Sequence, residues 1–319
     1  MEFKFFAKNS AKSDDDEEEG GLEVSGFNSA RDDLEKLWDE SNQISAIPTT
    51  AKNAAIAAGD CIMTALSMNF SVKNVLMIDA TLPSLDPIYG QSVYDDVAAV
   101  EFCVELAKEL HERKGSRERV AIILKDNNTI KRSKRVLQAP EDNNIYRLGS
   151  FLGDESPPTP GPDTIKQIVK LVASNAVAKD KDVPEETIII NAPISQVELV
   201  GVRWLLSNYG KDKTIILFNN RLNPLPNELA TAETVYSFLP LSMKSKKISS
   251  KSSDSLNPKV ILLRRYPNDW EIHVDVSKGG EDGFQCISSI EPSAVGKRGP
   301  SMDMIALEVQ RYMAERRQK

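Results

Sequence analysis

Polar residues stand at the ends of several short apolar segments of the sequence, and these are the positions from which ligand chemistry could come. Asp79 is near the end of the segment 75–80, Asn191 ends the segment 187–191, and Asn219 and Arg221 follow the segment 214–218. Carboxylates, amides and guanidinium groups are the acceptors and donors that hold a phosphorylated or nucleotide ligand. We therefore take Asp79, Asn191, Asn219 and Arg221 as candidate ligand contacts. The alternative role for such residues is to cap helices or to stabilise turns.

The basic segment 125–135, KDNNTIKRSKR, is the second candidate site. Asn127 or Asn128 can cap a helix there, and the first turns of that helix carry four cations: Lys131, Arg132, Lys134 and Arg135. A helix N-terminus and several cations together could clamp one anion. The alternative is an amphipathic helix whose basic side is solvated and whose apolar residues Ile130, Val136 and Leu137 face inward.

Several kinds of reactive equipment are missing from the sequence. The turns after the apolar segments lack the glycines that a phosphate-binding loop needs for close backbone approach. The sequence holds two distant histidines, His111 and His273, and three widely spaced cysteines, so we expect no metal site and no disulfide framework. Cys61 and Cys103 fall within apolar helical patterns and are expected to be buried. We expect no cofactor, and these absences favour a non-enzymatic role.

The elements that must position the candidate residues follow from apolar periodicity. Four short apolar bursts, 75–80, 120–125, 187–191 and 214–218, predict buried strands. Helical patterns stand before and between them, at 50–66, 94–113, 130–137, 164–177 and 196–209. This alternation predicts an open, mainly parallel sheet with helices on both faces, a Rossmann-like three-layer α/β fold. In such sheets the carboxyl ends of the strands share one edge, where ligands bind.

The C-terminal third has a different rhythm. Segments 233–239, 259–265, 271–276 and 285–290 are strand-like with little helical sequence between them, which predicts an antiparallel extension of the sheet. A closing helix is expected from about residue 301, with acids early and bases late. We predict a disordered acidic tail at 1–21, a short helix and linker at 22–45, and one α/β domain at 46–319 with a mobile Ser/Lys insertion at 244–257.

The charge distribution limits the class of partner. The formal net charge is -7, and the six consecutive acids at 14–19 account for nearly all of it. The nearly neutral remainder argues against nucleic acid and against an anionic membrane as partners. No apolar run reaches the roughly 20 residues that span a bilayer, so we expect peripheral membrane contact at most. Trp38, Arg265 and Trp270 are residue types favoured at protein interfaces, with burial in the core as the alternative.

Four segments of the second half carry a family resemblance. They are IIINAP at 188–193, IILFNNRL at 215–222, VYSFLPL at 235–241 and LLRRYPNDW at 262–270. Together they resemble the family of domains of unknown function called DUF1995. The resemblance extends over about residues 46–292 and is sharpest over 187–270. The chain departs from the family pattern after two strands, where it has Asn-Ala-Pro and Asn-Asn-Arg instead of an Asn-Pro pair.

The resemblance implies a location and a kind of partner. It implies a chloroplast protein of the stroma or the thylakoid surface that assists the assembly or stability of a photosystem, although residues 1–13 do not form a complete targeting peptide. It implies no catalytic residues. Our leading hypothesis is a non-enzymatic plastid auxiliary protein that binds a photosynthetic complex. The competing hypothesis is an enzyme or sensor that binds a nucleotide or phosphometabolite at the strand ends, with Lys131, Arg132 and Arg135 as the anion clamp.

Overall fold

The computed structural model describes residues 2–4, 47–48, 50–68, 74–82, 84–85, 94–115, 119–138, 144–176, 185–230, 232–244, 259–276, 283–295 and 299–318. Trp38, the predicted helix and linker at 22–45, and most of the predicted tail and insertion lie outside these residues. The elements of the described part are β1 (Glu2–Lys4), α2 (Ala51–Met68), β2 (Val75–Ala80), α3 (Asp96–Arg113), β3 (Arg119–Leu124), α4 (Asn127–Leu137), β4 (Tyr146–Ser150), α5 (Thr164–Asn175), β5 (Glu185–Asn191), α6 (Gln196–Tyr209), β6 (Thr214–Phe218), η2 (Asn227–Leu229), β7 (Glu233–Lys244), β8 (Lys259–Arg265), β9 (Trp270–Asp275), β10 (Phe284–Ile290), η3 (Pro292–Ala294) and α7 (Met302–Gln318).

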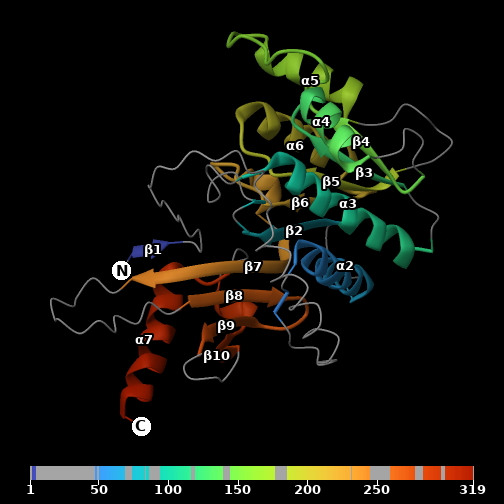
Figure 1. Cartoon of the computed structure of the whole chain (residues 1–319). Coiled ribbons are helices and arrows are strands. Elements are labelled where there is room, and N and C mark those ends of the chain that lie inside the picture. The colour runs from blue at the N-terminus through green and yellow to red at the C-terminus, as the bar shows by residue number, and fades with distance from the viewer. Residues whose placement is uncertain are drawn as a thin grey trace, which may run out of the picture.

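One ten-stranded sheet runs through the molecule (Figure 1). Its strand order is β10-β9-β8-β7-β2-β6-β5-β3-β4, and β1 pairs with β7 off this path. The strands from β7 to β4 are parallel to their neighbours, whereas β8, β9 and β10 are antiparallel. The predicted open, mainly parallel sheet with an antiparallel C-terminal extension is thus confirmed.

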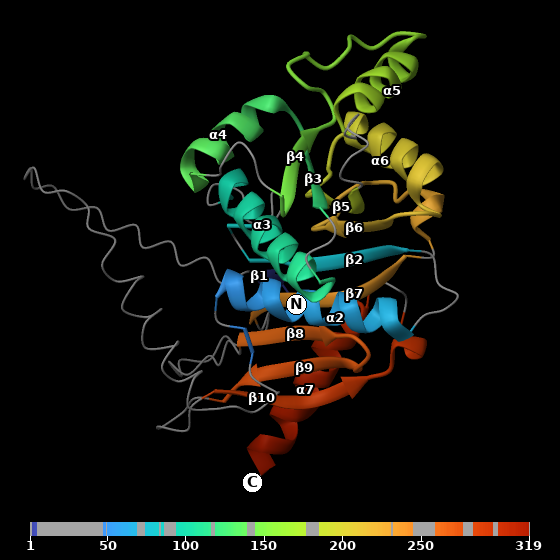
Figure 2. The same cartoon turned by 90° about the vertical axis from the view of Figure 1, so that its right-hand side faces the viewer.

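Alternate residues of each central strand enter two different cores, because successive side chains point to opposite faces. In β3, Ile122 and Leu124 pack into the cluster on the side of α2 and α3, whereas Ala121 and Ile123 pack into the cluster on the side of α5 and α6. Figure 2 shows α2 and α3 in front of the sheet. Because helices cover both faces of the sheet, the central strands must be apolar on both sides.

A third core lies under the antiparallel strands. Helix α7 packs Ile305, Ala306 and Val309 against residues of β7, β8 and β9. In Figure 2, α7 lies behind these strands, on the face opposite to α2. This core gives the C-terminal third its own apolar interior, and β8 is buried on both faces because Ile261 and Leu263 pack on the side of α2 while Val260 and Leu262 pack under α7.

Two predictions about the sheet need correction, and one strand was missed. Strand β7 was expected to be antiparallel to its neighbours, but it is parallel to β2 on one side and antiparallel to β8 on the other. Residues 2–4 were expected in a disordered tail, but they form β1 beside residues 242–244 of β7, which continues past the end of its pairing with β2. Strand β4 was not predicted, because its sequence YRLGS has no apolar run. It is an edge strand stabilised by Arg147, whose guanidinium pairs with the buried Glu185 of β5.

Candidate functional site

The carboxyl ends of β2 and β6 bring two of the predicted residues into direct contact. Arg221 donates a hydrogen bond from Nη1 to Asp79 Oδ1 at 2.8 Å and another from Nη2 to Thr81 Oγ1 at 3.3 Å. The Arg221 side chain is 13% exposed and that of Asp79 is 29% exposed. The pair therefore lies at the surface of the sheet edge with part of each charge screened by water.

Asn219 is a structural clamp at this edge and is not exposed to solvent. It is fully buried and has a φ of 47°, a left-handed conformation that asparagine tolerates better than most residues. Its Nδ2 donates to the carbonyls of Ala80 and Leu85 at 3.0 and 2.8 Å, and its Oδ1 accepts from the Ala80 amide at 2.8 Å. Both amide protons are thus in use, and the side chain ties β6 to the segment that follows β2.

Asn191 faces a different neighbour. It is 8% exposed, and its Oδ1 accepts a weak hydrogen bond from the Cys103 thiol of α3 at 3.7 Å. The next residue, Ala192, has a φ of 42° and donates its amide to the carbonyl of Phe218. Burial raises the pKa of the Cys103 thiol far above its usual range, so this thiol stays protonated. The Asn191 side chain consequently packs under α3, and among the described contacts it makes none with Asp79 or Arg221.

The expected anion clamp on α4 is not assembled in the structure. Asp126 caps the helix in place of the predicted Asn127 or Asn128, which lie in its first turn, and Asp126 Oδ1 accepts from the Thr129 amide at 2.9 Å, so the N-terminus already holds a carboxylate. Lys131 pairs with Asp154 at 2.8 Å, and Arg132 pairs with Asp96 at 2.7 Å. Arg135 is exposed on the same helix. Lys131 and Arg132 thus interact with different acids and do not converge on one point. The amphipathic alternative is only partly right, because Val136, expected to face inward, is 56% exposed and the buried residue of α4 is Ser133.

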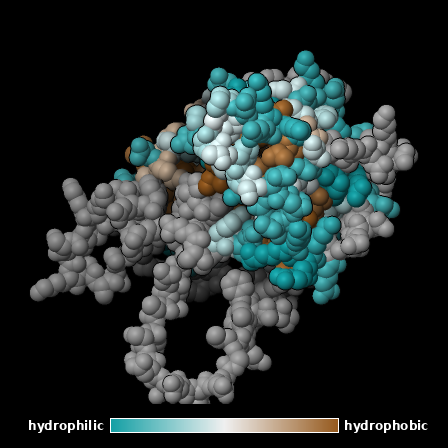
Figure 3. All heavy atoms as spheres, turned by 90° about the horizontal axis from the view of Figure 1, so that it is seen from above, coloured by the Kyte–Doolittle hydropathy of each residue, from teal (hydrophilic) through white to brown (hydrophobic). Residues whose placement is uncertain are grey.

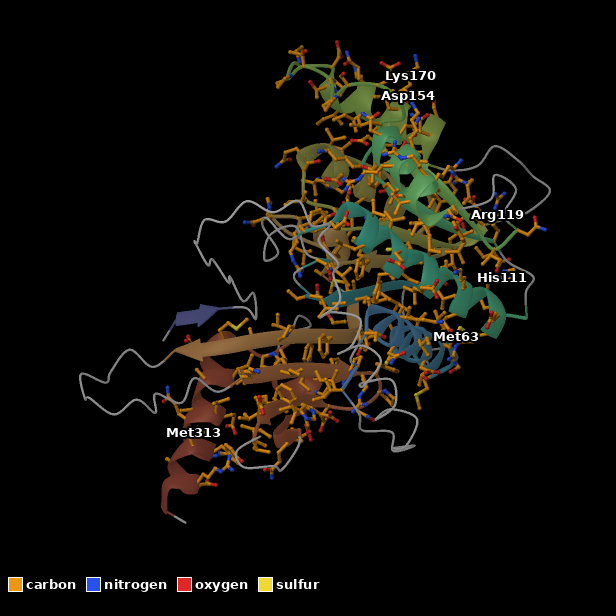
Figure 4. The ribbon with its side chains drawn as sticks, viewed as in Figure 1. Met63, His111, Arg119, Asp154, Lys170 and Met313 are labelled. Atoms are coloured by element: carbon orange, nitrogen blue, oxygen red, sulfur yellow. The ribbon has the colours of Figure 1, made fainter. Side chains whose placement is uncertain are left out.

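The Lys131–Asp154 ion pair lies in solvent at the surface of the molecule. Figure 4 places Asp154 and Lys170 at the upper end of the molecule. Hydrogen bonds from Lys131 and Asn127 hold the pKa of the Asp154 carboxyl below its usual value. Both Lys131 and Asp154 are about two-thirds exposed, with side chains at 69% and 68%. Exposed pairs of this kind contribute little to stability and leave the charges available to solvent.

The two described interface candidates differ in exposure. Trp270 was a candidate for partner contact, but only 3% of it is exposed and it belongs to the core under α7. Gly299 lies on its ring, where a Cβ atom would come within 2.6 Å of the indole. Trp270 is therefore a core residue, which is the alternative that the sequence left open for it. Arg265 is 17% exposed and pairs with Glu271 at 3.2 Å.

Sequence reasoning missed a polar network on β8 and β9. Glu271 Oε2 accepts from Arg265 Nη2 and lies 2.9 Å from His273 Nε2. The hydrogen bond from His273 and the charge of Arg265 lower the pKa of the Glu271 carboxyl despite its partial burial. The signal was available in principle, because Glu271 and His273 are two residues apart on one strand and so share a face. The pairing with Arg265 depends on the register between strands, which no local pattern reveals.

The described residues form neither a metal site nor a membrane span. In the part of the chain that the structure covers, no group of three or more His, Cys, Asp or Glu side chains is arranged to hold a metal ion. Among the helices described, none is both long enough and apolar enough to cross a membrane.

Comparison with known proteins identifies the family. No curated protein and no solved structure matches the chain. A family model described as a domain of unknown function, DUF1995, matches residues 48–294. The matched region begins just before α2 and ends in η3, so it contains the whole parallel sheet, the strand-end residues and the antiparallel strands. The chain therefore belongs to the DUF1995 family.

Proposed function

We propose that this chain is a non-catalytic auxiliary protein of the plastid that acts by binding a photosynthetic complex. The observation that carries the proposal is the state of the strand-end edge, where Asp79, Asn219 and Arg221 are bonded to groups of the chain itself. A ligand at this edge would first have to displace these contacts, and their loss subtracts from its affinity. The plastid location and the photosynthetic partner rest on what the family resemblance implies.

Exposed apolar side chains support contact with a macromolecule. Ile165 in the first turn of α5 is 64% exposed, and Ile194 just before α6 is 45% exposed. Both follow strands of the parallel sheet and so lie toward its carboxyl edge, and α5 packs beside α6. Figure 3 shows hydrophobic spots of this kind within a largely hydrophilic face. Exposed apolar side chains within a polar surface are what a protein partner buries.

The test is association in isolated thylakoids. A tagged chain should comigrate with a photosystem complex on native gels and on sucrose gradients after gentle detergent treatment. The double variant Ile165→Glu with Ile194→Glu should lose the comigration, because each buried apolar contact would be replaced by a charge. Met68→Glu is the matched control, since Met68 is 60% exposed at the end of α2, near the opposite edge of the sheet. A chain that migrates only at its own mass would overturn the proposal.

One observation favours a small ligand instead. The Nδ2 atom of Asn220 is buried and has no hydrogen-bond partner among the described residues, and Asn220 stands between Asn219 and Arg221. An acceptor group of a phosphorylated ligand would satisfy this donor. Under this alternative, nucleotides or sugar phosphates should raise the melting temperature in proportion to the logarithm of their concentration, and Arg221→Gln should abolish the effect. Under the leading proposal these compounds leave the melting temperature unchanged.

A further inference from the structure

Strand β10 is the outermost strand at the antiparallel end of the sheet. It pairs with β9 from residue 284 to residue 290, and no other strand of the described chain pairs with it. Figure 2 shows it as the lowest strand of the sheet. One row of its backbone N–H and C=O groups therefore points away from the sheet, with no backbone partner in the parts of the chain that the structure covers. Such a row is a template for another strand.

The composition of β10 leaves this edge unprotected by charge. Its sequence FQCISSI contains no charged residue and no proline, and its side chains at Gln285, Cys286 and Ser289 are exposed. Proteins usually blunt an edge with lysine, proline, short length or a bulge. Here only a bulge between Cys286 and Ser288 is present. The opposite edge, β4, is two residues shorter and carries Arg147.

Helix α7 continues the surface beside this edge. The Tyr312 hydroxyl donates to Gln285 Oε1 of β10 at 3.2 Å. Met304 lies eight residues earlier on the same helical row, with Glu308, which pairs with Arg311, between them. Leu307 points to a different side of the helix. Met304 is 37% exposed and Leu307 is 65% exposed, because α7 uses its other side to cover the third core. The edge strand is thus uncharged, whereas the exposed side of α7 beside it carries apolar side chains together with the Glu308–Arg311 ion pair.

We propose that β10 pairs antiparallel with β10 of a second copy of this chain. The result is a two-fold dimer in which the sheet continues from one copy into the other. A two-fold axis places the same surface opposite itself, so an interface of this kind excludes like charges facing each other. The absence of charge on β10 meets that requirement. A peptide of another protein would need side-chain pockets beside the strand for selectivity, and on the α7 side that space is filled by the third core.

Cys286 provides the direct measurement. Of the three cysteines it is the exposed one, whereas Cys61 and Cys103 are buried, so a nitroxide reagent labels the unmodified chain at β10. The label projects from a face of the sheet and leaves the edge free. For any antiparallel register with at least four residue pairs, a rise of about 3.4 Å per residue keeps the two Cys286 Cα atoms within about 18 Å. Pulsed dipolar spectroscopy should therefore give a short distance between the labels.

The oligomeric state and two variants complete the test. Light scattering should show a dimer whose fraction grows with concentration. Ser289→Lys puts two positive charges into the interface and should weaken the dimer at least about tenfold. Ser207→Lys is the matched control, since Ser207 is exposed on α6, away from α7. A monomer at every concentration would overturn the proposal, and so would a dimer whose labels lie far apart. If Ser289→Lys does not fold, the distance in the unmutated chain still decides.

Discussion

Replacing Asn219 tests whether the strand-end edge is built for structure or for a ligand. In Asn219→Ala the Ala80 amide loses its acceptor, and two carbonyls lose the donor that they share. A buried donor left unsatisfied costs about 1–3 kcal/mol. Alanine at a φ of 47° adds about 1 kcal/mol of backbone strain. We expect the free energy of unfolding to fall by about 2–4 kcal/mol.

The neighbouring residue provides the control for this prediction. Asn220 has the same side chain, but its amide oxygen accepts only one hydrogen bond, from the Leu222 amide at 3.1 Å, and its Nδ2 has no partner in the described chain. Asn220→Ala should therefore cost about 1 kcal/mol or less. Asn219→Gly should lie between the two alanine variants, because glycine loses the same hydrogen bonds but adopts a positive φ without strain.

Urea unfolding followed by circular dichroism measures these differences, provided that the slope with denaturant is unchanged between variants. The clamp interpretation fails if Asn219→Ala and Asn220→Ala are equally stable. The ligand hypothesis would be favoured if Asn219→Ala were as stable as the unmutated chain but were no longer stabilised by a phosphorylated compound. The two hypotheses thus predict different effects of one substitution.

Three further predictions concern packing, pH and thiol reactivity. Gly201→Ala should lower the free energy of unfolding by about 1–3 kcal/mol, because the added Cβ would lie 2.4 Å from Phe151, whereas Gly161→Ala in an open loop should have little effect in the same urea titration. The depressed pKa of Glu271 means that the unfolded chain binds a proton there more readily, so this carboxylate stabilises the fold above its unfolded pKa, and the contribution disappears as pH falls through its folded pKa. Glu271→Gln should flatten this acid-side decrease in melting temperature, and an unchanged pH profile would contradict the assignment. A thiol reagent should modify Cys286 in the native chain and all three cysteines in denaturant, and rapid native reaction of the other two would contradict their burial.

Local pattern was sufficient for most of the parallel half. The predicted segments 75–80 and 214–218 coincide with β2 and β6, and the predicted helix at 196–209 coincides with α6. Strands covered on both faces must be apolar throughout, so their sequences stand out from the helices between them. Strand β4 escaped prediction because an edge strand needs no such run and relies on an ion pair with β5.

The local sequence pattern could not predict which distant segments pair with each other. The sequence indicated strand-like character for β7 but not that it inserts between β2 and β8, since strand order depends on how the whole chain crosses over the sheet. The same limit applied to Trp270, whose burial depends on α7 and on Gly299 nearly thirty residues later. Interface and core favour the same aromatic residues, so residue type alone could not separate these two roles.

The sequence by itself determined that this chain forms an α/β sheet with polar groups at its carboxyl edge, because strand and helix periodicities and turn residues are local properties. Only the tertiary structure decided what those polar groups do. Asn219 is a buried clamp, Arg221 pairs with Asp79, and Lys131 and Arg132 of α4 pair with separate acids. A side chain's role depends on which groups from other segments come within hydrogen-bonding distance, and that is settled by the packing of elements far apart in the chain.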